Sequence, residues 1–348
     1  MKFAIHHSTN YQFSKRWIDY CEANNITYKI VDAYDTNIIN NLKDCDVFLW
    51  QFTQARYEDK LMAKQLLYSI EASGVKVFPD FKSSWHFDDK IAQKYLLESL
   101  DVPFIKSYVF YTKKSSIKWL EQTTFPKVFK LRGGASSMNV FLVNNFKEAK
   151  KIVNKAFSRG FSSYNWKFRF LEAVRKFRKQ QGSFKAILGL ILYSWKRYPN
   201  DHAKFMGNEK GYVYFQDFIP KNNYDIRIII VNNKSFAVKR LNRENDFRAS
   251  GSGNIIYDKS QIDERCVELA FNVNKKLMAQ CVAFDFIFDE HLNPLIVEIS
   301  YAFSPSAYDK CEGYWDENLQ WFSGEFNPYG WMIEGLRSST KSKLIKHT

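Results

Sequence analysis

Val282-Ala-Phe-Asp-Phe-Ile-Phe-Asp289 and Leu295-Ile-Val-Glu-Ile299 are two apolar runs separated by the turn sequence Glu290-His-Leu-Asn-Pro294. The pattern predicts a β-hairpin in which each strand carries one acid, Asp285 in the first and Glu298 in the second. Carboxylates buried side by side repel each other and are costly to desolvate unless a cation joins them. Mg²⁺ takes such oxygen ligands and shares them with nucleotide phosphates. The hairpin therefore predicts a magnesium–nucleotide site, and the alternative, in which one acid faces solvent from an edge strand, stays open.

More strands precede the hairpin. We predict strands at Tyr212–Ile219, Ile226–Val231 and Ser235–Leu241, and a helix at Glu264–Gln280 with apolar residues close to helical spacing. The first of these strands exits into Pro220 and is typical of a hinge whose backbone pairs with an adenine edge. The residues of that hinge are Gln216, Asp217, Phe218 and Ile219.

Arginines cluster after this hinge. Asp225-Ile-Arg227 opens the next strand, Arg240 closes the strand after it, and Arg243 and Arg248 precede a loose glycine loop. Several arginines converging beside a carboxylate pair suit a triphosphate and an anionic co-substrate. Any one of them, taken singly, is more commonly a surface charge.

A second glycine-containing loop follows a basic strand in Phe125-Pro-Lys-Val-Phe-Lys-Leu-Arg-Gly-Gly-Ala-Ser-Ser137. Small residues such as Gly133, Gly134 and Ser136 let backbone N–H groups approach phosphate oxygens, and Lys130 adds a point charge. No GxxxxGK sequence follows, so the loop is not a Walker A motif. A plain Gly-Gly turn between strands is the competing interpretation.

The first hundred residues alternate between strand and helix patterns. We predict strands at Phe3–His6, Thr27–Val31, Asp46–Gln51 and Val75–Phe78 with helices between them, which is the rhythm of a small parallel sheet. His6 and His7 end the first strand, on the side where open parallel sheets bind ligands, and a contact with the substrate follows as a weaker expectation.

Composition restricts the class of protein. Apolar residues make up 45% of the chain and aromatic residues 17%, which is a globular composition. No apolar run is long enough to span a bilayer and no secretion signal is recognisable, so we expect a cytoplasmic protein. The cysteines are widely separated, which favours reduced thiols over disulfides or a zinc site. They are Cys21, Cys45, Cys266, Cys281 and Cys311.

Positive charge is concentrated in one segment. The formal charge is +14, and the stretch 151–197 holds twelve Lys or Arg residues against the single acid Glu172. Phe161–Tyr198 mixes these cations with aromatic residues in a largely helical pattern. Such a segment suits peripheral contact with the inner membrane face or a lipid-linked phosphorylated substrate. A helical cover with a solvated basic face is the plainer interpretation, and nucleic acid is the weakest of the three.

The order of these pieces resembles the ATP-grasp superfamily, which includes D-alanine–D-alanine ligase and the ribosomal-protein glutamate ligases. The resemblance covers about residues 85–335. It implies an α/β fold of mixed α+β type: an N-terminal parallel βα domain, residues 1–84, and two further α+β subdomains that clasp ATP. The central subdomain would span 85–211, with the basic insert at about 158–200, and the C-terminal one 212–348.

The same resemblance implies roles for single residues. Lys90 and Lys130 would be the two ATP lysines, the loop from Gly133 to Ser137 the phosphate lid, and Gln216–Ile219 the adenine hinge. Arg227 and Arg240 would hold phosphates or an acyl phosphate. Asp285 and Glu298 would hold one or two Mg²⁺ ions. The family usually reads Glu-x-Asn on the second metal strand, and Ser300 replaces that asparagine here, so the ligand of a second ion is in doubt.

A narrower resemblance concerns the substrate. Trp85-His-Phe-Asp-Asp-Lys90, Gly313-Tyr-Trp-Asp316 and Trp331-Met-Ile-Glu334 look like segments of ATP-grasp proteins associated with bacterial surface-polysaccharide synthesis. The implied activity is an ADP-forming ligation of a small-molecule carboxylate to an amine, with a sugar nucleotide or lipid-linked sugar as one partner. Two alternatives remain, a catalytically weak ATP-binding module of a glycan-assembly complex and a phosphotransferase. The choice between monomer and homodimer is open.

Overall fold

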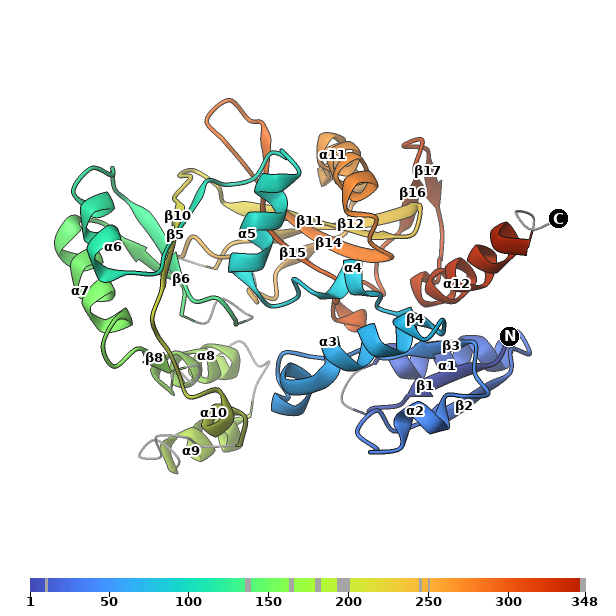
Figure 1. Cartoon of the computed structure of the whole chain (residues 1–348). Helices are drawn as coiled ribbons and strands as arrows, with labels where there is room; N and C mark the ends of the chain where they lie inside the picture. Colours follow the sequence, from blue (N-terminus) through green and yellow to red (C-terminus); the bar gives the residue numbers. More distant parts are fainter. Residues whose placement is uncertain are drawn as a thin grey trace.

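The computed structural model describes residues 1–9, 12–134, 139–162, 166–178, 183–192, 201–243, 246–249 and 251–344. Within these ranges, the chain folds around three main sheets that lie in different parts of the molecule (Figure 1). None of the described helices combines the length and apolar character needed to cross a bilayer.

The N-terminal sheet is parallel with the strand order β2-β1-β3-β4, as the alternating pattern predicts. Its strands are short, and the two central ones, β1 and β3, are fully buried. The strands are β1 (Phe3–His6), β2 (Tyr28–Val31), β3 (Val47–Leu49) and β4 (Lys76–Phe78). The helices are α1 (Phe13–Ala23), α2 (Ile38–Asn41) and α3 (Tyr57–Ala72).

Two helices lead out of this sheet, α4 (Phe81–Ser84) and α5 (Lys90–Ser99). Asp80 caps α4 by accepting the Ser83 N–H, and Asp89 caps α5 by accepting the N–H groups of Ile91 and Ala92. An aspartate before the first helical residue satisfies N–H groups that the helix itself leaves unbonded. This cap makes Lys90 the first residue of α5.

The central sheet is antiparallel with the order β5-β10-β6-β7. The last strand of this sheet in chain order, β10, pairs with β5 and β6 after a long excursion, so the chain leaves this sheet only after Asp217. The strands are β5 (Ser107–Phe110), β6 (Lys127–Lys130), β7 (Phe141–Val143) and β10 (Val213–Asp217), and the helices beside them are α6 (Lys113–Leu120) and α7 (Phe146–Ala156).

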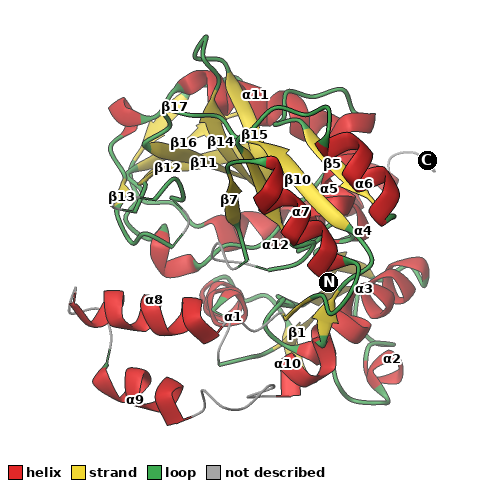
Figure 2. Ribbon diagram, turned by 90° about the vertical axis from the view of Figure 1, so that its left-hand side faces the viewer, coloured by secondary structure: helices red, strands yellow, loops and turns green. Residues whose placement is uncertain are grey.

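The excursion between β7 and β10 contains the basic insert. Its described elements are β8 (Phe161–Ser162), α8 (Trp166–Arg178), α9 (Phe184–Leu192), α10 (Asp201–Met206) and β9 (Asn208–Glu209). Figure 2 shows α8 and α9 side by side at the lower left, apart from the large sheets. The predicted helical character of the insert is confirmed over these residues.

The C-terminal sheet has the order β15-β14-β11-β12-β16-β17, and β13 pairs with β12. The strands are β11 (Tyr224–Val231), β12 (Lys234–Leu241), β13 (Ile255–Ile256), β14 (Cys281–Phe288), β15 (Pro294–Ser300), β16 (Gly313–Asp316) and β17 (Trp321–Ser323). The helical segments are η1 (Lys259–Gln261), α11 (Glu264–Leu277), η2 (Pro305–Ala307) and α12 (Pro328–Leu344). The predicted hairpin 282–299 is thus confirmed, whereas α11 ends before the predicted Gln280, at Met278 with a φ of 54°.

Each face of this sheet joins a different core. On β11, Ile226, Ile228 and Ile230 pack in the core beneath α11, whereas Ile229 and Val231 pack in the core shared with α1 and α12. Successive strand residues point to opposite faces, so this division follows directly from the pleat. The second core joins the N-terminal sheet to the C-terminal one.

Candidate functional site

The pleat also gathers the charged residues of the C-terminal sheet. Asp225 and Arg227 share the face of Ile229, and Asp285 shares the face of Ala283 on the neighbouring strand. The register then pairs Asp225 with Arg240, Arg227 with Asp285, and Asp285 with Glu298. The charges therefore meet where the apolar part of this face ends.

Four of these charges form a connected network. The Asp285 carboxylate accepts two hydrogen bonds from Arg227, at 2.5 and 2.9 Å, and its Oδ2 lies 2.9 Å from Arg240 Nη2. Arg240 in turn donates to both oxygens of Asp225, at 2.6 Å each. Burial opposes ionisation of Asp285, but the two arginines prevail and lower the pKa of that carboxyl to about 2. Asp285 is therefore an anion at neutral pH.

A cavity of about 610 Å³ lies beside this network. It takes in most of the residues that the sequence analysis selected. Those that line it are Lys90, Lys130, Gly134, Gln216, Asp217, Phe218, Ile219, Arg227, Asp285, Glu298 and Ser300.

Three selected residues are not among those that line the main cavity in the described part of the chain. Gly133 lines a smaller neighbouring pocket. Arg240 does not line the main cavity and is buried between Asp225 and Asp285, and its role in holding phosphates or an acyl phosphate stays a prediction. Ser136 falls outside the described residues. Arg240 lies on β12, which pairs with β11. This pairing puts Asp225, rather than the cavity, next to the Arg240 guanidinium.

Two buried lysines enter the cavity from different elements. Lys90 Nζ lies 3.4 Å from Glu298 Oε1, and the attraction of Glu298 and Asp88 outweighs the effect of burial, so the pKa of Lys90 is raised. Lys130 donates to Gln216 Oε1 at 2.6 Å. Burial lowers the pKa of Lys130 to about 8, although Glu298 opposes that shift. Two amine cations and the hairpin carboxylates thus share one chamber.

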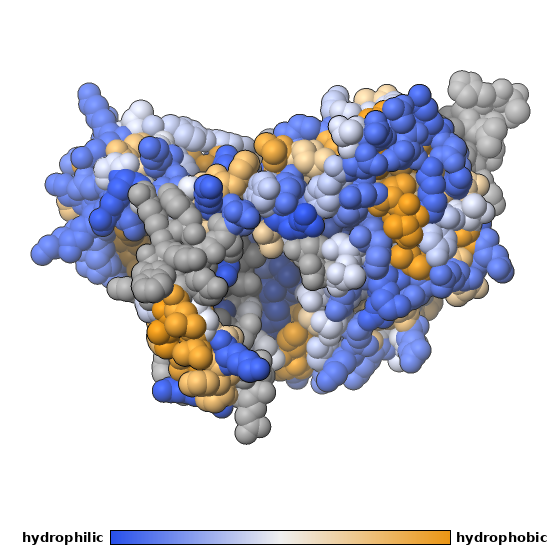
Figure 3. All heavy atoms as spheres, turned by 90° about the horizontal axis from the view of Figure 1, so that it is seen from below, coloured by the Kyte–Doolittle hydropathy of each residue, from blue (hydrophilic) through white to orange (hydrophobic). Residues whose placement is uncertain are grey.

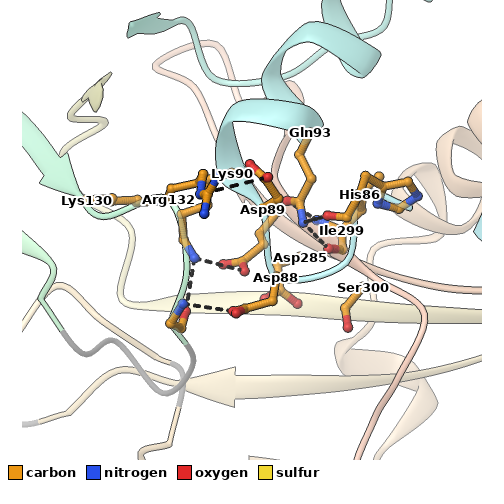
Figure 4. A network of polar contacts seen from close by, with 12 residues as sticks. His86, Asp88, Asp89, Lys90, Gln93, Lys130, Arg132, Asp285, Ile299 and Ser300 are labelled. Atoms are coloured by element: carbon orange, nitrogen blue, oxygen red, sulfur yellow. Dashed lines mark hydrogen bonds and ion pairs between the residues drawn. The ribbon is translucent and has the colours of Figure 1, made fainter. Parts of the chain in front are cut away.

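The start of the predicted phosphate lid is held by the linker before α5. Asp88 Oδ1 accepts the Gly134 N–H at 2.8 Å, and Lys90 Nζ donates to the Gly134 carbonyl at 3.0 Å. Figure 4 shows Asp88, Lys90 and Arg132 gathered on one side of the linker, with His86 on the other. Asp88 was not selected from the sequence, although its place next to Asp89 and Lys90 was a usable signal.

His86 has a structural place. It is almost fully buried, packs edge-on against Trp85 with ring centroids 5.7 Å apart, and does not line the cavity. Burial lowers the pKa of its imidazole to about 4, so the ring is neutral at pH 7. His86 is therefore placed as a packed, neutral histidine outside the cavity.

The hinge residues form another part of the cavity lining. Gln216 is buried and bonds through its side chain to Lys130 and to Ser107 Oγ, at 2.6 and 3.2 Å. The Phe218 ring meets Phe247 edge-on with centroids 5.7 Å apart. These residues, with Ile219, form an apolar and hydrogen-bonding end wall of the kind that a purine ring requires.

The N-terminal domain supplies a wall that the sequence analysis missed. Gln51, Phe52, Thr53 and Gln54 follow β3 and line the cavity together with Gln12. The selected His6 instead accepts the Ala33 N–H at 3.0 Å, and neither His6 nor His7 lines the cavity. The carboxyl-end rule for parallel sheets pointed to the correct edge, and the third strand rather than the first provides the residues.

The hairpin carboxylates fit one Mg²⁺ ion. Among the described residues, no group of three or more His, Cys, Asp or Glu side chains converges to form an all-protein metal site. Asp285 and Glu298 offer two carboxylates, and Mg²⁺ at nucleotide sites takes further ligands from phosphate and water. The Glu298 side chain is a third exposed. The Ser300 hydroxyl donates to the Ala302 carbonyl at 2.9 Å, so it is already engaged in a local turn.

Comparisons with known proteins agree with this geometry. Residues 197–313 match the model of the RimK-like ATP-grasp domain. The α-aminoadipate–LysW ligase LysX of Saccharolobus solfataricus is 20% identical over 234 residues, which are 67% of this chain and 68% of that protein. A phosphoribosylamine–glycine ligase of Caldanaerobacter subterraneus is 27% identical over 94 residues, which are 27% of this chain but only 22% of that ligase.

Solved structures extend the likeness over nearly the whole chain. A RimK domain ATP-grasp protein from Sphaerobacter thermophilus superposes with a TM-score of 0.56 at 14% identity, covering 97% of this chain and 99% of that one. The D-alanine–D-alanine ligase of Bacillus anthracis, complexed with ATP, gives a TM-score of 0.52 at 13% identity, covering 89% and 91%. The matched segment and the solved structures show that the chain has the fold of ATP-grasp proteins.

Proposed function

We propose that this protein is an ATP-dependent ligase that joins a carboxylate to an amine through an acyl phosphate and releases ADP and phosphate. The observation that carries the proposal is the register pairing of Asp285 with Glu298 in the same cavity as Lys90 and Lys130. The carboxylates of the C-terminal sheet thus share a chamber of nucleotide size with the ammonium groups of Lys90 on α5 and Lys130 on the central sheet.

The proposed chemistry has two steps. A substrate carboxylate oxygen attacks the γ-phosphorus, and the bond between that phosphorus and the β–γ bridging oxygen breaks to release ADP. An amine nitrogen then attacks the acyl carbon, the C–O bond to phosphate breaks, and the nitrogen loses a proton. Catalysis of this kind rests on positioning and on neutralising negative charge rather than on a covalent enzyme intermediate.

We assign each part of this chemistry to residues according to where they lie in the cavity. Lys90 and Lys130 bind the phosphates, and the loop from Gly133 to Ser137 is the predicted lid over them. Asp285 and Glu298 hold Mg²⁺, which neutralises charge on the phosphate oxygens when it is bound. Arg227, which lines the cavity, binds the acyl phosphate, while Arg240 acts from behind by fixing Asp285.

The adenine lies at the hinge, where Gln216, Asp217, Phe218 and Ile219 line the cavity. The buried Gln216 side chain links this end to the phosphate end because it bonds to Lys130. The backbone groups of Phe218 and Ile219, which follow the end of β10 at Asp217, serve the purine edge.

The acceptor lies against the N-terminal wall. Gln12, Gln51 and Gln54 are neutral amides that donate and accept hydrogen bonds, which suits a hydroxyl-rich substrate better than a charged one. This favours a sugar derivative, such as a sugar nucleotide or a lipid-linked sugar, as one of the two small-molecule partners. We therefore place the reaction in surface-polysaccharide synthesis, joining an amino acid or amine to a sugar.

Acyl-phosphate formation is tested without knowing the amine. The protein is incubated with Mg-ATP, hydroxylamine and a panel of amino acids and uronic-acid sugar nucleotides, and hydroxamate and ADP are measured. The expected result is hydroxamate in proportion to ADP for one carboxylate class. Glu298→Gln and Lys130→Met should each lower turnover by at least a hundredfold, because each removes charge stabilisation at the phosphates.

Matched controls are Glu325→Gln and Lys114→Met, two exposed residues that do not line the cavity. Turnover in Glu298→Gln equal to that of Glu325→Gln would contradict the proposal. The alternative of a catalytically weak binding module rests on Ser300, whose hydroxyl is engaged with Ala302. It predicts ATP binding with no ADP release across the whole panel.

A further inference from the structure

The insert carries apolar side chains that nothing in the described structure covers. Phe184, Leu188, Ile191 and Leu192 follow the spacing of a single helix face on α9 and are all exposed. Leu171 and Phe177 on α8 are exposed as well, and the exposed fractions run from 45% at Phe177 to 66% at Leu171.

The two helices contact each other through a buried residue and through partly exposed aromatic side chains. Ile187 is buried, Trp166 Nε1 donates to the Leu190 carbonyl at 2.7 Å, and the rings of Phe177 and Phe184 lie 5.9 Å apart. Packing between α8 and α9 therefore leaves these apolar residues exposed. Figure 3 shows an apolar patch at the lower left of the molecule seen from below, on the side where α8 and α9 lie.

Cations surround this apolar surface. Between residues 166 and 192 the sequence has seven Lys or Arg and one acid. Arg169, Arg178 and Lys185 are exposed at the surface. An anionic bilayer surface attracts such cations and takes up neighbouring apolar side chains at the depth of the headgroups.

The exposed face of α9 distinguishes a bilayer from nucleic acid. Three of its four exposed apolar residues, Leu188, Ile191 and Leu192, are aliphatic and offer no ring on which a base could stack. Aliphatic side chains gain instead from transfer into hydrocarbon. Charge and shape together therefore favour a lipid surface.

The hairpin also reaches the candidate active site. Arg175 on α8 donates to the carbonyls of Ser252 and Gly251, at 3.2 and 3.1 Å. Arg248 and Ala249, just before these residues, line the main cavity. A displacement of α8 would therefore act on the loop that forms part of the cavity wall.

We propose that the α8–α9 hairpin docks this protein on an anionic membrane surface, with the exposed face of α9 toward the lipid, and that docking is transmitted through Arg175 to the cavity wall. The docking stands independently of the ligase reaction, and only its effect on turnover rests on the proposed function.

Docking is measured by cosedimentation of the full chain with phosphatidylcholine vesicles, with and without phosphatidylglycerol. Binding is expected only to the anionic vesicles and should weaken as salt is added, because the attraction is screened. Arg178→Gln with Lys185→Gln should lower the partition coefficient by about thirtyfold, on the basis of each charge near the surface. Phe184→Ser with Leu188→Ser should reduce it to a similar extent.

Each control variant carries the same number and kind of substitutions, placed on surfaces outside the α8–α9 hairpin. Lys43→Gln with Lys114→Gln removes two exposed charges, and Ile39→Ser with Leu61→Ser removes two exposed apolar groups. Both should bind as the wild type does. Wild-type binding to neutral vesicles alone, no vesicle binding at all, or retention by RNA in place of vesicles would each overturn the docking.

Transmission to the active site has a separate test. Arg175→Lys keeps the charge but loses the two-pronged contact with the Gly251 and Ser252 carbonyls, whereas Arg178→Lys is its matched neighbour. Anionic vesicles should change the rate of ADP release by the wild type and by Arg178→Lys at least threefold, and should leave Arg175→Lys unaffected although it still binds vesicles. A vesicle response in Arg175→Lys equal to that of the wild type would overturn the transmission and leave the docking result unaffected.

Discussion

At the scale of single residues, the site depends on buried charges of opposite sign that neutralise each other. Asp225, Arg227, Arg240 and Asp285 carry two positive and two negative charges in contact with each other. A buried ion pair adds little net stability over an apolar pair, but removing one member leaves the others without compensation. The arrangement therefore stabilises the position of Asp285 more than it stabilises the fold.

Arg240 is the member whose loss is most informative, because it bonds to both aspartates and does not line the cavity. Arg240→Met should lower the free energy of unfolding by about 3 to 5 kcal/mol, since two buried carboxylates lose their shared cation. Arg265→Met is the control, because the exposed Arg265 pairs with Asp263 and its loss should change stability by less than about 1 kcal/mol. Equal urea midpoints for the two variants would contradict the role given to Arg240.

Lys130 gives nucleotide binding a pH dependence. Burial lowers the pKa of its amine to about 8, so the free protein loses this charge as the pH rises through that value. Phosphates bind the protonated form, and the affinity for ADP should therefore fall by about tenfold between about pH 7 and about pH 9. Calorimetric titration at several pH values measures it.

Lys130→Met is expected to bind ADP more weakly and with little change over the same pH range. Lys127 supplies the comparison, because it lies on the same strand, pairs with Asp217 at 2.6 Å and does not line the cavity. Lys127→Met should keep the wild-type slope. A slope that survives in Lys130→Met would assign the titration to another group.

At the scale of elements, helix α5 fixes the metal-binding strand through one side chain. Gln93 donates to the Ile299 carbonyl at 2.8 Å and accepts the Ile299 N–H at 3.2 Å, between Glu298 and Ser300. The amide thus completes the hydrogen bonds of β15 where no neighbouring strand does so. A buried backbone group left without a partner costs about 1 to 3 kcal/mol.

Gln93→Leu should therefore lower the free energy of unfolding by about 2 kcal/mol or more, and should weaken Mg-ADP binding because Glu298 loses its support. Gln65→Leu, a change of the same kind at an exposed position of α3, should be nearly neutral in stability. Denaturant unfolding and ADP titration measure the two effects. Loss of stability with unchanged Mg-ADP affinity would limit Gln93 to a structural role.

Many of the helices and strands could be predicted from the sequence. The hairpin 282–299 and the parallel N-terminal strands were predictable because their apolar patterns are local. The place of β10 in the central sheet was not, since β10 pairs with strands that precede a long insert. Likewise, Asp285 was a recognisable ligand candidate, whereas its bonds to Arg227 and Arg240 depend on a register that local pattern does not specify.

Helix α12 was missed although its start carries a signal. Asn327 Oδ1 accepts the N–H groups of Tyr329 and Gly330, and Pro328 occupies the first helical position. Asn followed by Pro is a common helix start. Gly330 and Gly335, which disfavour helix, obscured it, and both have a packing reason that only the fold reveals.

At the scale of the whole molecule, the cavity wall is built from parts that are far apart in the sequence. Gln51 comes from the N-terminal sheet, Lys130 from the central sheet and Glu298 from the C-terminal sheet. The first and last of these parts share a core in which Phe13 and Trp17 of α1 pack with Ile333 of α12. The distance between Gln51 and Glu298 therefore depends on how closely α1 and α12 approach.

Gly330 sets that approach. A Cβ atom at this position would lie 2.4 Å from Tyr20 Cε2 and 2.8 Å from Tyr20 Cδ2, and a ring packed against a helix cannot move aside as a flexible chain end can. Gly330→Ala should lower the free energy of unfolding by about 1 to 3 kcal/mol, even after the gain in helix propensity. Gly189→Ala in α9, where a Cβ would meet nothing within 4 Å, should leave stability unchanged or raise it by about 0.5 to 1 kcal/mol.

The same variant tests whether the two walls act together. If α12 shifts away from α1, the wall containing Gln51 moves relative to the hairpin carboxylates, so KM for the acceptor should rise severalfold in Gly330→Ala. KM for ATP should change little, because Lys130, Gln216 and Glu298 do not depend on α1 for their positions. Equal increases in both KM values would instead show that α12 supports the nucleotide end of the cavity as well.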